Sequence, residues 1–445
     1  MAAADEASVE PLEVLVGRAG AAVARAAAEM MGGTYGRRVV VVAGKGNNGA
    51  DGRAAAAWLA RRGVWTEVVD AVAATERLPA CDRVVDAAYG TGFQGEYVAP
   101  DPGAAPVLAV DIPSGVDGLT GRAGERAVRA TRTVTFAALK PGLLLSSGPD
   151  LAGETSVVDI GLALPPARAH LVEAPDVAGW LPSRPRDTHK WASSVWVVAG
   201  SPGMTGAASL ACRGAMRAGA GLVRLGTPGE PAVADGAAPE VLRMPLPEEG
   251  WDADVLGDLD RFKALVVGPG LGRSDSRRVA VRRLLSSARD LPVVVDADGL
   301  YALGSAAEAA DVIGDRQAAT VLTPHAGEFA RLAGAPPAAD RLASARDLAA
   351  ATGATVLLKG STTVVADPDG AVLLSNSGGP RLATAGTGDV LAGIIGAFLA
   401  QGLDGLRSAG AAAFVHGAAG ALGWPRGLVA GDLPELLPVV LSSLC

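Results

Sequence analysis

Short runs of valine, leucine and alanine recur along the chain, and each is followed by a polar or glycine-rich loop and then by a helical segment. The first run, residues 37–43 (RRVVVVA), is continuously apolar after its two arginines, as expected of a strand buried on both faces of a sheet. Strands that alternate with helices in this way form βαβ units and parallel sheets. The predicted fold class is therefore α/β.

The strand signals fall into two series. The first series occupies residues 37–43, 65–70, 83–87, 107–111, 133–138 and 156–160, with a loop at 44–51 and a helix at 52–62. The second occupies residues 195–199, 222–225, 264–267, 292–296, 319–322 and 355–358, followed by a hairpin (362–366 and 371–375) and a final helix (389–400). Residues 163–185 are proline-rich and aperiodic, which is typical of a linker. Two domains are predicted, at residues 1–162 and 186–445.

Composition excludes several classes of protein. The net charge of −8 and the pI of about 5.2 disfavour a nucleic acid as the main partner. The most apolar helical segment, residues 390–400, is too short to cross a bilayer. Cys81, Cys212 and Cys445 lack metal-ligand spacing, and the first residues lack the pattern of a secretory signal. We expect a cytoplasmic protein that acts on small molecules without a membrane partner.

Three polar loops follow strands of the first series: residues 43–52 (AGKGNNGADG), 86–96 and 111–117. The carboxyl ends of parallel strands meet at one edge of the sheet, where open α/β sheets bind ligands. Asp86 and Asp111 each end an apolar strand, and a desolvated carboxylate there can act as a general base. A single strand-end aspartate could equally cap a helix or a turn, but three such loops together favour a ligand site.

In this order, the segments AGKGNNGADG, VDAAYGTGFQGE, VDIPSGVDG and TFAALKPGL resemble the NAD(P)H-hydrate epimerase domain, which implies a Rossmann-like sheet. The resemblance implies an isomerase that interconverts the R and S forms of hydrated NADH and NADPH. It implies Asp111 as catalytic residue and a potassium ion held by Asn48, Asp86 and Ser114, oxygen ligands that suit a hard cation. The implied substrate-binding residues are Asn47, Asn48, Gly49, Ala50, Asp51, Gly90, Thr91, Gly92, Phe93, Gln94, Gly95, Glu96 and Asp111.

One position departs from the family's pattern in this loop. Ala50 stands where the family usually has glycine. An alanine would strain the loop if this residue needs a positive φ.

The second series carries its own polar segments. Residues 383–389 (ATAGTGD) open an apolar helix, and a glycine-rich turn at a helix N-terminus forms an anion hole. Asp389 could take the proton of a hydroxyl that attacks a phosphoryl group. Lys359 precedes a glycine and three hydroxyl residues and is one of only five lysines, so a compact ammonium for nucleotide phosphates is indicated. His325 lies at a strand end near a carboxylate, which favours ligand contact over a purely structural role.

The order GSPGMTGAA, GPGLG, DADGL, LTPHAGE, LKGSTT and ATAGTGDVLAG resembles the ADP- or ATP-dependent NAD(P)H-hydrate dehydratase domain, which implies a ribokinase-like fold. The resemblance implies a lyase that phosphorylates the hydroxyl of the S hydrate and then eliminates phosphate, with ADP as phosphoryl donor and Mg²⁺ as cofactor. Asp389 would be catalytic. Substrate contacts are implied for Ala207, Gly270, Gly272, His325 and Asp389, and nucleotide contacts for Lys359, Gly360, Ser361, Thr362, Thr363 and Gly388.

The leading prediction is a bifunctional enzyme that repairs hydrated NADH and NADPH. The alternative is a ribokinase-like kinase of a small alcohol, whose first half is an inactive dinucleotide- or partner-binding module. A phosphorylated product that accumulates would favour the alternative. The motifs do not discriminate NADH hydrate from NADPH hydrate, or ADP from ATP, and a homo-oligomer is an expectation from the family alone.

Overall fold

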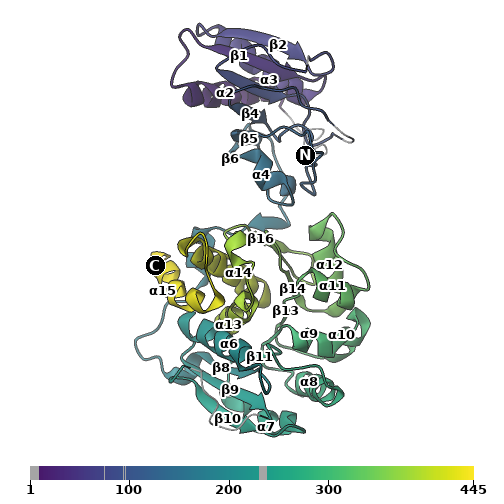
Figure 1. The fold of residues 1–445 in the computed structure, drawn as a ribbon, viewed down its shortest axis with the longest axis vertical. Coiled ribbons are helices and arrows are strands. Elements are labelled where there is room, and N and C mark those ends of the chain that lie inside the picture. The colour runs from purple at the N-terminus through teal and green to yellow at the C-terminus, as the bar shows by residue number, and fades with distance from the viewer. Residues whose placement is uncertain (1–9, 75, 94, 96, 230–237, 445) are drawn as a thin grey trace. The chain divides into compact units, whose positions relative to one another are not determined.

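The computed structural model describes residues 10–74, 76–93, 95, 97–229 and 238–444. The chain divides into two compact units, Met1–Ala167 and Arg168–Cys445, and each is built from a sheet and its covering helices (Figure 1). Among the helices of the described residues, none is long and apolar enough to cross a membrane.

The first unit contains a six-stranded sheet in the order β2-β1-β3-β4-β5-β6, with every pairing parallel. Helices α2 and α3 cover one face, and loop residues cover the other. Because all six strands run the same way, their carboxyl ends share one edge. The strands are β1 (Arg38–Ala43), β2 (Trp65–Asp70), β3 (Arg83–Ala87), β4 (Val107–Val110), β5 (Arg132–Phe136) and β6 (Glu154–Val158), and the helices are α2 (Leu12–Met31), α3 (Asn47–Ala60) and α4 (Gly148–Ala152).

The second unit contains a ten-stranded sheet in the order β10-β9-β8-β11-β12-β13-β14-β15-β16-β7. Strands from β10 to β14 are parallel, whereas β15 pairs antiparallel with both of its neighbours. The strands are β7 (Ala169–Leu171), β8 (Ser194–Val198), β9 (Leu222–Pro228), β10 (Leu242–Leu246), β11 (Ala264–Val267), β12 (Val293–Val295), β13 (Thr320–Leu322), β14 (Thr355–Leu358), β15 (Thr363–Ala366) and β16 (Val372–Ser375).

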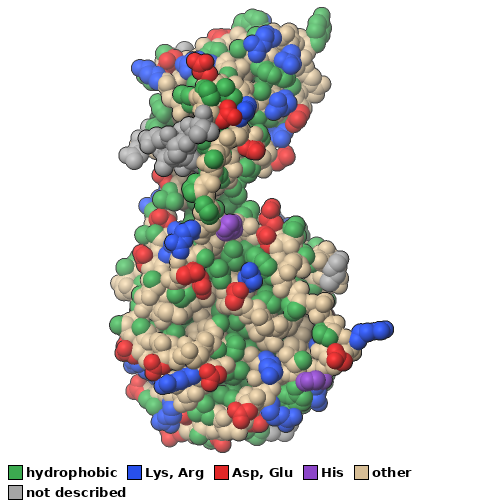
Figure 2. Space-filling view, turned by 180° about the vertical axis from the view of Figure 1, so that it is seen from behind, with side chains coloured by type: hydrophobic (Ala, Val, Ile, Leu, Met, Phe, Trp, Pro, Cys, Tyr) green, Lys and Arg blue, Asp and Glu red, His purple; other side chains and the backbone are tan. Residues whose placement is uncertain are grey.

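Helices enclose this second sheet, and its main core forms where α6, α13, α14 and α15 pack on buried valines of the central strands. On the face shown in Figure 2, basic and acidic side chains are interspersed over each unit. The helices are α5 (Ala174–Trp180), α6 (Thr205–Arg217), α7 (Trp251–Leu256), α8 (Asp275–Ser287), α9 (Asp298–Leu303), α10 (Ala306–Ile313), α11 (Ala326–Ala333), α12 (Arg341–Thr352), α13 (Thr387–Ala400), α14 (Gly405–Leu422) and α15 (Leu433–Ser443).

The structure differs from the sequence prediction at several places, one of them strand β10, which the predicted second series lacks. Helix α3 begins at Asn47 rather than at residue 52. Gly46, in extended conformation, is its N-cap residue. Ala50 therefore has a helical backbone and causes no strain.

The segment 163–185 is not a linker throughout, since it contains two elements of the second unit. These are β7, which extends the second sheet beside β16, and helix α5. The helix that begins near residue 389 is not the last, because α14 and α15 follow it.

Two glycines on α2 provide a matched test of the packing between α2 and α3. A Cβ atom on Gly20 would lie 2.5 Å from the Cβ of Ala54 and 2.9 Å from the backbone nitrogen of Ala55, whereas a Cβ on Gly17 would meet nothing within 4 Å. We expect Gly20→Ala to destabilise the first unit by about 1–3 kcal/mol through overpacking. Gly17→Ala should stabilise it by about 0.5–1 kcal/mol through helix propensity.

Hydrogen–deuterium exchange of peptides from α2 and α3 checks this pair of variants. Faster exchange in Gly20→Ala and unchanged or slower exchange in Gly17→Ala is expected. Equal exchange in both variants would show that the close approach of the two helices does not limit stability.

Candidate functional site

The carboxyl edge of the first sheet borders a cavity of about 1000 Å³. Its wall combines the loops after β1, β3, β4 and β5 with residues of α2 and the end of β6. The predicted site residues that line it are Asn47, Asn48, Asp51, Gly90, Thr91, Gly92, Phe93 and Asp111. Gly49, Ala50 and Gly95 are described but do not line it, while Gln94 and Glu96 lie outside the described residues. Three separately predicted loops therefore meet at one cavity.

Asp111 is held on this cavity by a buried ion pair. Its Oδ1 atom lies 2.5 Å from Nζ of Lys140, and it also accepts hydrogen bonds from the Thr135 hydroxyl (3.1 Å) and the Phe136 amide (3.3 Å). The Lys140 residue is only 4% exposed, yet it lines the same cavity. A carboxylate in contact with an ammonium group inside a cavity is suited to proton transfer at its remaining oxygen.

The three implied potassium ligands show a different arrangement. The Ser114 hydroxyl donates to Asp86 Oδ1 at 2.7 Å, and its amide donates to Oδ2 at 2.8 Å. Burial raises the pKa of Asp86 to about 6, against the lowering effect of those hydrogen bonds. Asn48 donates from Nδ2 to the Val110 carbonyl at 2.6 Å, while its buried Oδ1 has no hydrogen-bond partner among the residues that the structure describes. Asp86 and Ser114 do not line the large cavity; Asp86 lines a smaller one of about 300 Å³.

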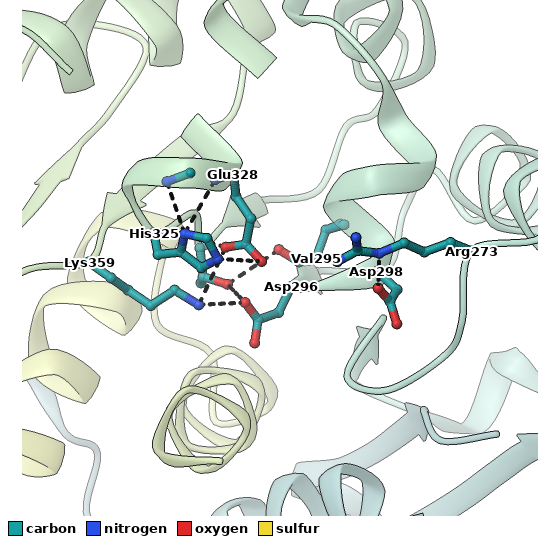
Figure 3. Close-up of polar contacts among 9 residues, drawn as sticks. Arg273, Val295, Asp296, Asp298, His325, Glu328 and Lys359 are labelled. Atoms are coloured by element: carbon teal, nitrogen blue, oxygen red, sulfur yellow. Dashed lines mark hydrogen bonds and ion pairs between the residues drawn. The ribbon is translucent and has the colours of Figure 1, made fainter. Parts of the chain in front are cut away.

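In the second unit, side chains from the ends of three strands converge around Lys359 (Figure 3). Lys359 follows β14, and its Nζ lies 2.8 Å from Asp296 Oδ1 and 3.9 Å from Glu328 Oε2. Asp296 follows β12 and also accepts a hydrogen bond from the Thr323 hydroxyl at 2.7 Å. Burial works to lower the pKa of Lys359, but the charges of Asp296 and Glu328 raise it above its ordinary value. The lysine is thus held as an ammonium group.

His325 begins helix α11 instead of lying free at the strand end. Its Nδ1 accepts hydrogen bonds from the amides of Gly327 (3.0 Å) and Glu328 (3.3 Å), and Glu328 accepts from the His325 amide in return (2.9 Å). The His325 side chain is still 60% exposed. It therefore caps a helix and also presents its ring to solvent, where a ligand can reach it.

Asp389 lies in the first turn of α13, after the glycine-rich turn. Gly386 precedes the helix with a φ of 91°. Burial, followed by the negative charge of Asp296, raises the pKa of Asp389 to about 7, although the charge of Lys359 acts in the opposite sense. A Cβ on Gly388 would lie 3.4 Å from Nζ of Lys359. The start of α13 and the lysine thus face each other, with a carboxyl group that titrates near neutrality beside them.

The remaining predicted residues lie around this centre. A Cβ on Gly270 would lie 3.0 Å from the Cβ of Ala207, so these two predicted substrate contacts are neighbours. The amide of Gly272 donates to Asp298 Oδ2 at 2.9 Å, and Arg273 Nε donates to Oδ1 at 2.7 Å (Figure 3). Of the predicted nucleotide contacts, Gly360 and Ser361 are exposed in a turn, Thr362 is buried, and Thr363 begins β15.

Sequence reasoning missed the partners of the predicted residues: Lys140, Asp296, Glu328 and Asp298. Asp296 ends an apolar strand, which is the signal that selected Asp86 and Asp111. Lys140 is one of the five lysines in a chain that otherwise uses arginine, and that scarcity could have marked it.

Comparisons with known proteins agree over both units. Residues 195–438 match the family model described as NAD(P)H-hydrate dehydratase, and residues 12–77 and 66–142 match the one described as YjeF-related protein N-terminus. The bifunctional NAD(P)H-hydrate repair enzyme of Mycobacterium tuberculosis is 43% identical over 400 residues, which covers 84% of this chain and 80% of that protein. The enzyme of the same name from Salinibacter ruber is 38% identical over 519 residues, covering 100% of this chain and 95% of that protein.

Solved structures match the second unit. The ADP/ATP-dependent NAD(P)H-hydrate dehydratase of Bacillus subtilis, co-crystallised with ATP and Mg²⁺, is 32% identical with a TM-score of 0.53, covering 61% of this chain and 98% of that chain. A ribokinase-like superfamily protein of Enterococcus faecalis has a TM-score of 0.54 at 21% identity, covering 64% of this chain and 99% of that chain. The predicted ribokinase-like fold is confirmed.

Asp296 and Asp298 offer a matched test of the cluster around Lys359. We expect Asp296→Asn to destabilise the second unit by about 2–4 kcal/mol, because it leaves a partly buried ammonium group without its nearest counter-charge. Asp298→Asn should cost about 1 kcal/mol or less, because its partner Arg273 is 54% exposed. Urea unfolding of both variants measures the difference, and equal losses would assign Asp296 no special role in holding the lysine.

Proposed function

The chain belongs to the family of bifunctional NAD(P)H-hydrate repair enzymes, and we propose a specific set of residues for each of its two reactions. The enzyme epimerises the R and S hydrates of NADH and NADPH and dehydrates the S hydrate with the help of a nucleotide. The observation that carries the assignment is the carboxyl group of Asp389, raised in pKa to about 7, at the start of α13 beside Lys359. A kinase of a small alcohol is not favoured, because the relatives match both units.

In dehydration, Asp389 takes the proton from the hydroxyl at C6 of the S hydrate. The hydroxyl oxygen bonds to the terminal phosphorus of the nucleotide, and the bond from that phosphorus to its bridging oxygen breaks. Phosphate then leaves C6 with the C–O electron pair while the lone pair of N1 forms a double bond to C6. Loss of a proton from C5 restores the dihydronicotinamide. Ala207, Gly270, Gly272 and His325 hold the hydrate in this proposal.

Nucleotide binding uses the ammonium of Lys359, the turn from Gly360 to Thr363 and the amide of Gly388. We assign ADP as the phosphoryl donor, with ATP as the competing candidate. The Bacillus subtilis relative was crystallised with ATP and Mg²⁺. The carboxylates of Asp296 and Glu328 offer the oxygen ligands that Mg²⁺ takes together with phosphates, and the ion would neutralise phosphate charge during transfer.

In epimerisation, Asp111 acts as the base in the large cavity of the first unit. The C6 carbon of the hydrate carries both a hydroxyl and the ring nitrogen, so removal of the hydroxyl proton by Asp111 lets the oxygen form the carbonyl of an aldehyde. The electron pair of the broken C6–N1 bond passes to N1, where conjugation with the carboxamide spreads its charge. Rotation about C5–C6, reclosure by N1 and return of the proton give the other epimer. The substrate contacts are the lining residues from Asn47 to Asp51 and the loop from Gly90 to Glu96.

A potassium ion held by Asn48, Asp86 and Ser114 fits the chemistry of these donors. Asn48 Oδ1 is buried without a hydrogen-bond partner, and the buried Asp86 carboxylate has hydrogen bonds from Ser114 but no ion pair among the described residues. A cation beside them would satisfy both groups and would neutralise the negative charge of the buried Asp86 carboxylate. We assign the cytoplasm as the site of action, since coenzyme and nucleotide are used there, and a homo-oligomer remains a prediction.

Recovery of dihydronicotinamide absorbance from a mixture of R and S hydrates, with Mg²⁺ and either ADP or ATP, tests both assignments. The parent enzyme should repair the whole mixture, and Asp389→Asn should repair none. Asp111→Asn should repair the S fraction at the parent rate and the R fraction only at the spontaneous rate. Replacing potassium by choline should slow the R fraction alone.

Three results would count against these assignments. If Asp389→Asn repaired the hydrates at the parent rate, Asp389 would not be the catalytic base. Accumulation of a stable phosphorylated product would favour the kinase alternative, and a higher kcat/KM with ATP would replace ADP as donor.

The pH dependence of dehydration follows from the raised pKa of Asp389. The base must be unprotonated, so kcat/KM for pure S hydrate should rise with pH, reach half of its maximum near pH 7 and level off above it. The Asp111→Asn variant, with its change in the other unit, should show the same profile. A profile that stays flat from about pH 6 to about pH 8 would contradict a base that titrates near neutrality.

A further inference from the structure

Strands β4 and β5 both end in an unusual turn. The Ile112 amide donates to the Val110 carbonyl around Asp111, whose φ is 69°, and the Ala138 amide donates to the Phe136 carbonyl around Ala137, whose φ is 61°. Hydrogen bonds between residues two apart around a positive φ define the rare, strained form of the γ-turn. Neither central residue is glycine, so each turn costs about 1–3 kcal/mol that the surroundings must offset.

The two strained turns bring Lys140 and Asp111 together. The turn at Ala137 sends the chain back toward β5, so that Lys140 Nζ donates to the Phe136 carbonyl at 2.8 Å and to the Thr135 hydroxyl at 2.9 Å. Its third partner is Asp111 Oδ1 at 2.5 Å. An ammonium group has three protons, and all three are used. Lys140 therefore holds a fixed position as a cation and is not available as a mobile proton donor.

Every hydrogen bond found on the Asp111 carboxylate goes to Oδ1. That oxygen receives the Lys140 ammonium, the Thr135 hydroxyl and the Phe136 amide, whereas the part of the chain that the structure describes offers no hydrogen bond to Oδ2. The Asp111 side chain is 16% exposed and borders the large cavity. The two oxygens are thus distinguished: one is anchored in the protein and the other is left for a ligand.

We propose that Lys140 is a positioning residue for epimerisation, which fixes Asp111 through Oδ1 so that Oδ2 acts as the proton acceptor. This inference rests on the proposed role of Asp111 as base and adds how its orientation is maintained. In the reaction Oδ2 accepts the hydroxyl proton and returns it when the ring closes, while Lys140 keeps its three protons throughout.

The charge and the shape of lysine are both required by this geometry. Three acceptors surround one nitrogen in a site where the residue is 4% exposed, which suits the compact ammonium of a lysine better than a planar guanidinium. The anchoring also explains why a chain with 39 basic residues, only five of them lysines, uses lysine here.

The test compares Lys140→Met and Lys140→Gln with the parent enzyme. Methionine keeps an unbranched chain without the charge, and glutamine keeps hydrogen-bond donors without the charge. Both variants should lose roughly 100-fold in kcat for epimerisation, with KM changed far less, because the base is no longer oriented.

Dehydration of pure S hydrate by the same molecules serves as the internal control, since it reports on the second unit. Hydrogen–deuterium exchange of β4 and β5 peptides identifies a variant whose first unit has unfolded, and the other variant then carries the test. The double variant Asp111→Asn/Lys140→Met should epimerise at the same rate as Asp111→Asn alone, because Lys140 acts only through Asp111.

Two outcomes distinguish a failure of the positioning role of Lys140 from a failure of the proposed role of Asp111 as base. If Asp111→Asn is inactive but folded Lys140→Met and Lys140→Gln keep the parent kcat and KM for epimerisation, Lys140 has no positioning role and the inference is overturned. If Asp111→Asn epimerises at the parent rate, the base itself is misassigned and the proposed function of the first unit fails, whatever Lys140 does.

Discussion

A lysine paired with an aspartate at the end of a nearby strand organises each of the two sites. Lys140 holds Asp111 at the edge of the first sheet, and Lys359 holds Asp296 at the edge of the second. In both units parallel strands bring the partners together, because the ends of β4 and β5 in the first sheet, and of β12 and β14 in the second, lie at the same edge. The pairs differ in use: the first orients a carboxylate toward a cavity, and the second keeps an ammonium in front of a helix N-terminus that is suited to phosphate.

Much of this arrangement could be predicted from the sequence, and the reason is physical. A strand buried on both faces must be apolar along its length, so runs such as that in β1 are visible without any structure. Polar loops that follow such runs must lie at the carboxyl edge, which is why the loops that start at residues 43, 86 and 111 could be assigned to one edge of the sheet. The family resemblance then supplied the chemistry, and the comparisons bear out that family and both activities.

The remainder depended on tertiary context. Helix α14 is rich in glycine and alanine and is buried on nearly every side, so it lacks the one-sided pattern that reveals a surface helix. Strand β7 is three residues long and gains its partner β16 from two hundred residues further along the chain. The helical start of α3 was hidden because its first residues, asparagine and glycine, favour turns. The partners of Asp111 and Lys359 also depend on tertiary contacts, because they lie in segments that no local sequence pattern links to these residues.

The paired γ-turns have a consequence for substitutions at either position. Replacing Asp111 alone leaves a buried ammonium without its counter-charge, and replacing Lys140 alone leaves two strained turns without the contact that joins them. Residues in direct contact contribute to stability non-additively, so removing the second partner should cost less than removing the first. The strained backbone and the ion pair therefore form a single stability unit at the carboxyl edge of the first sheet.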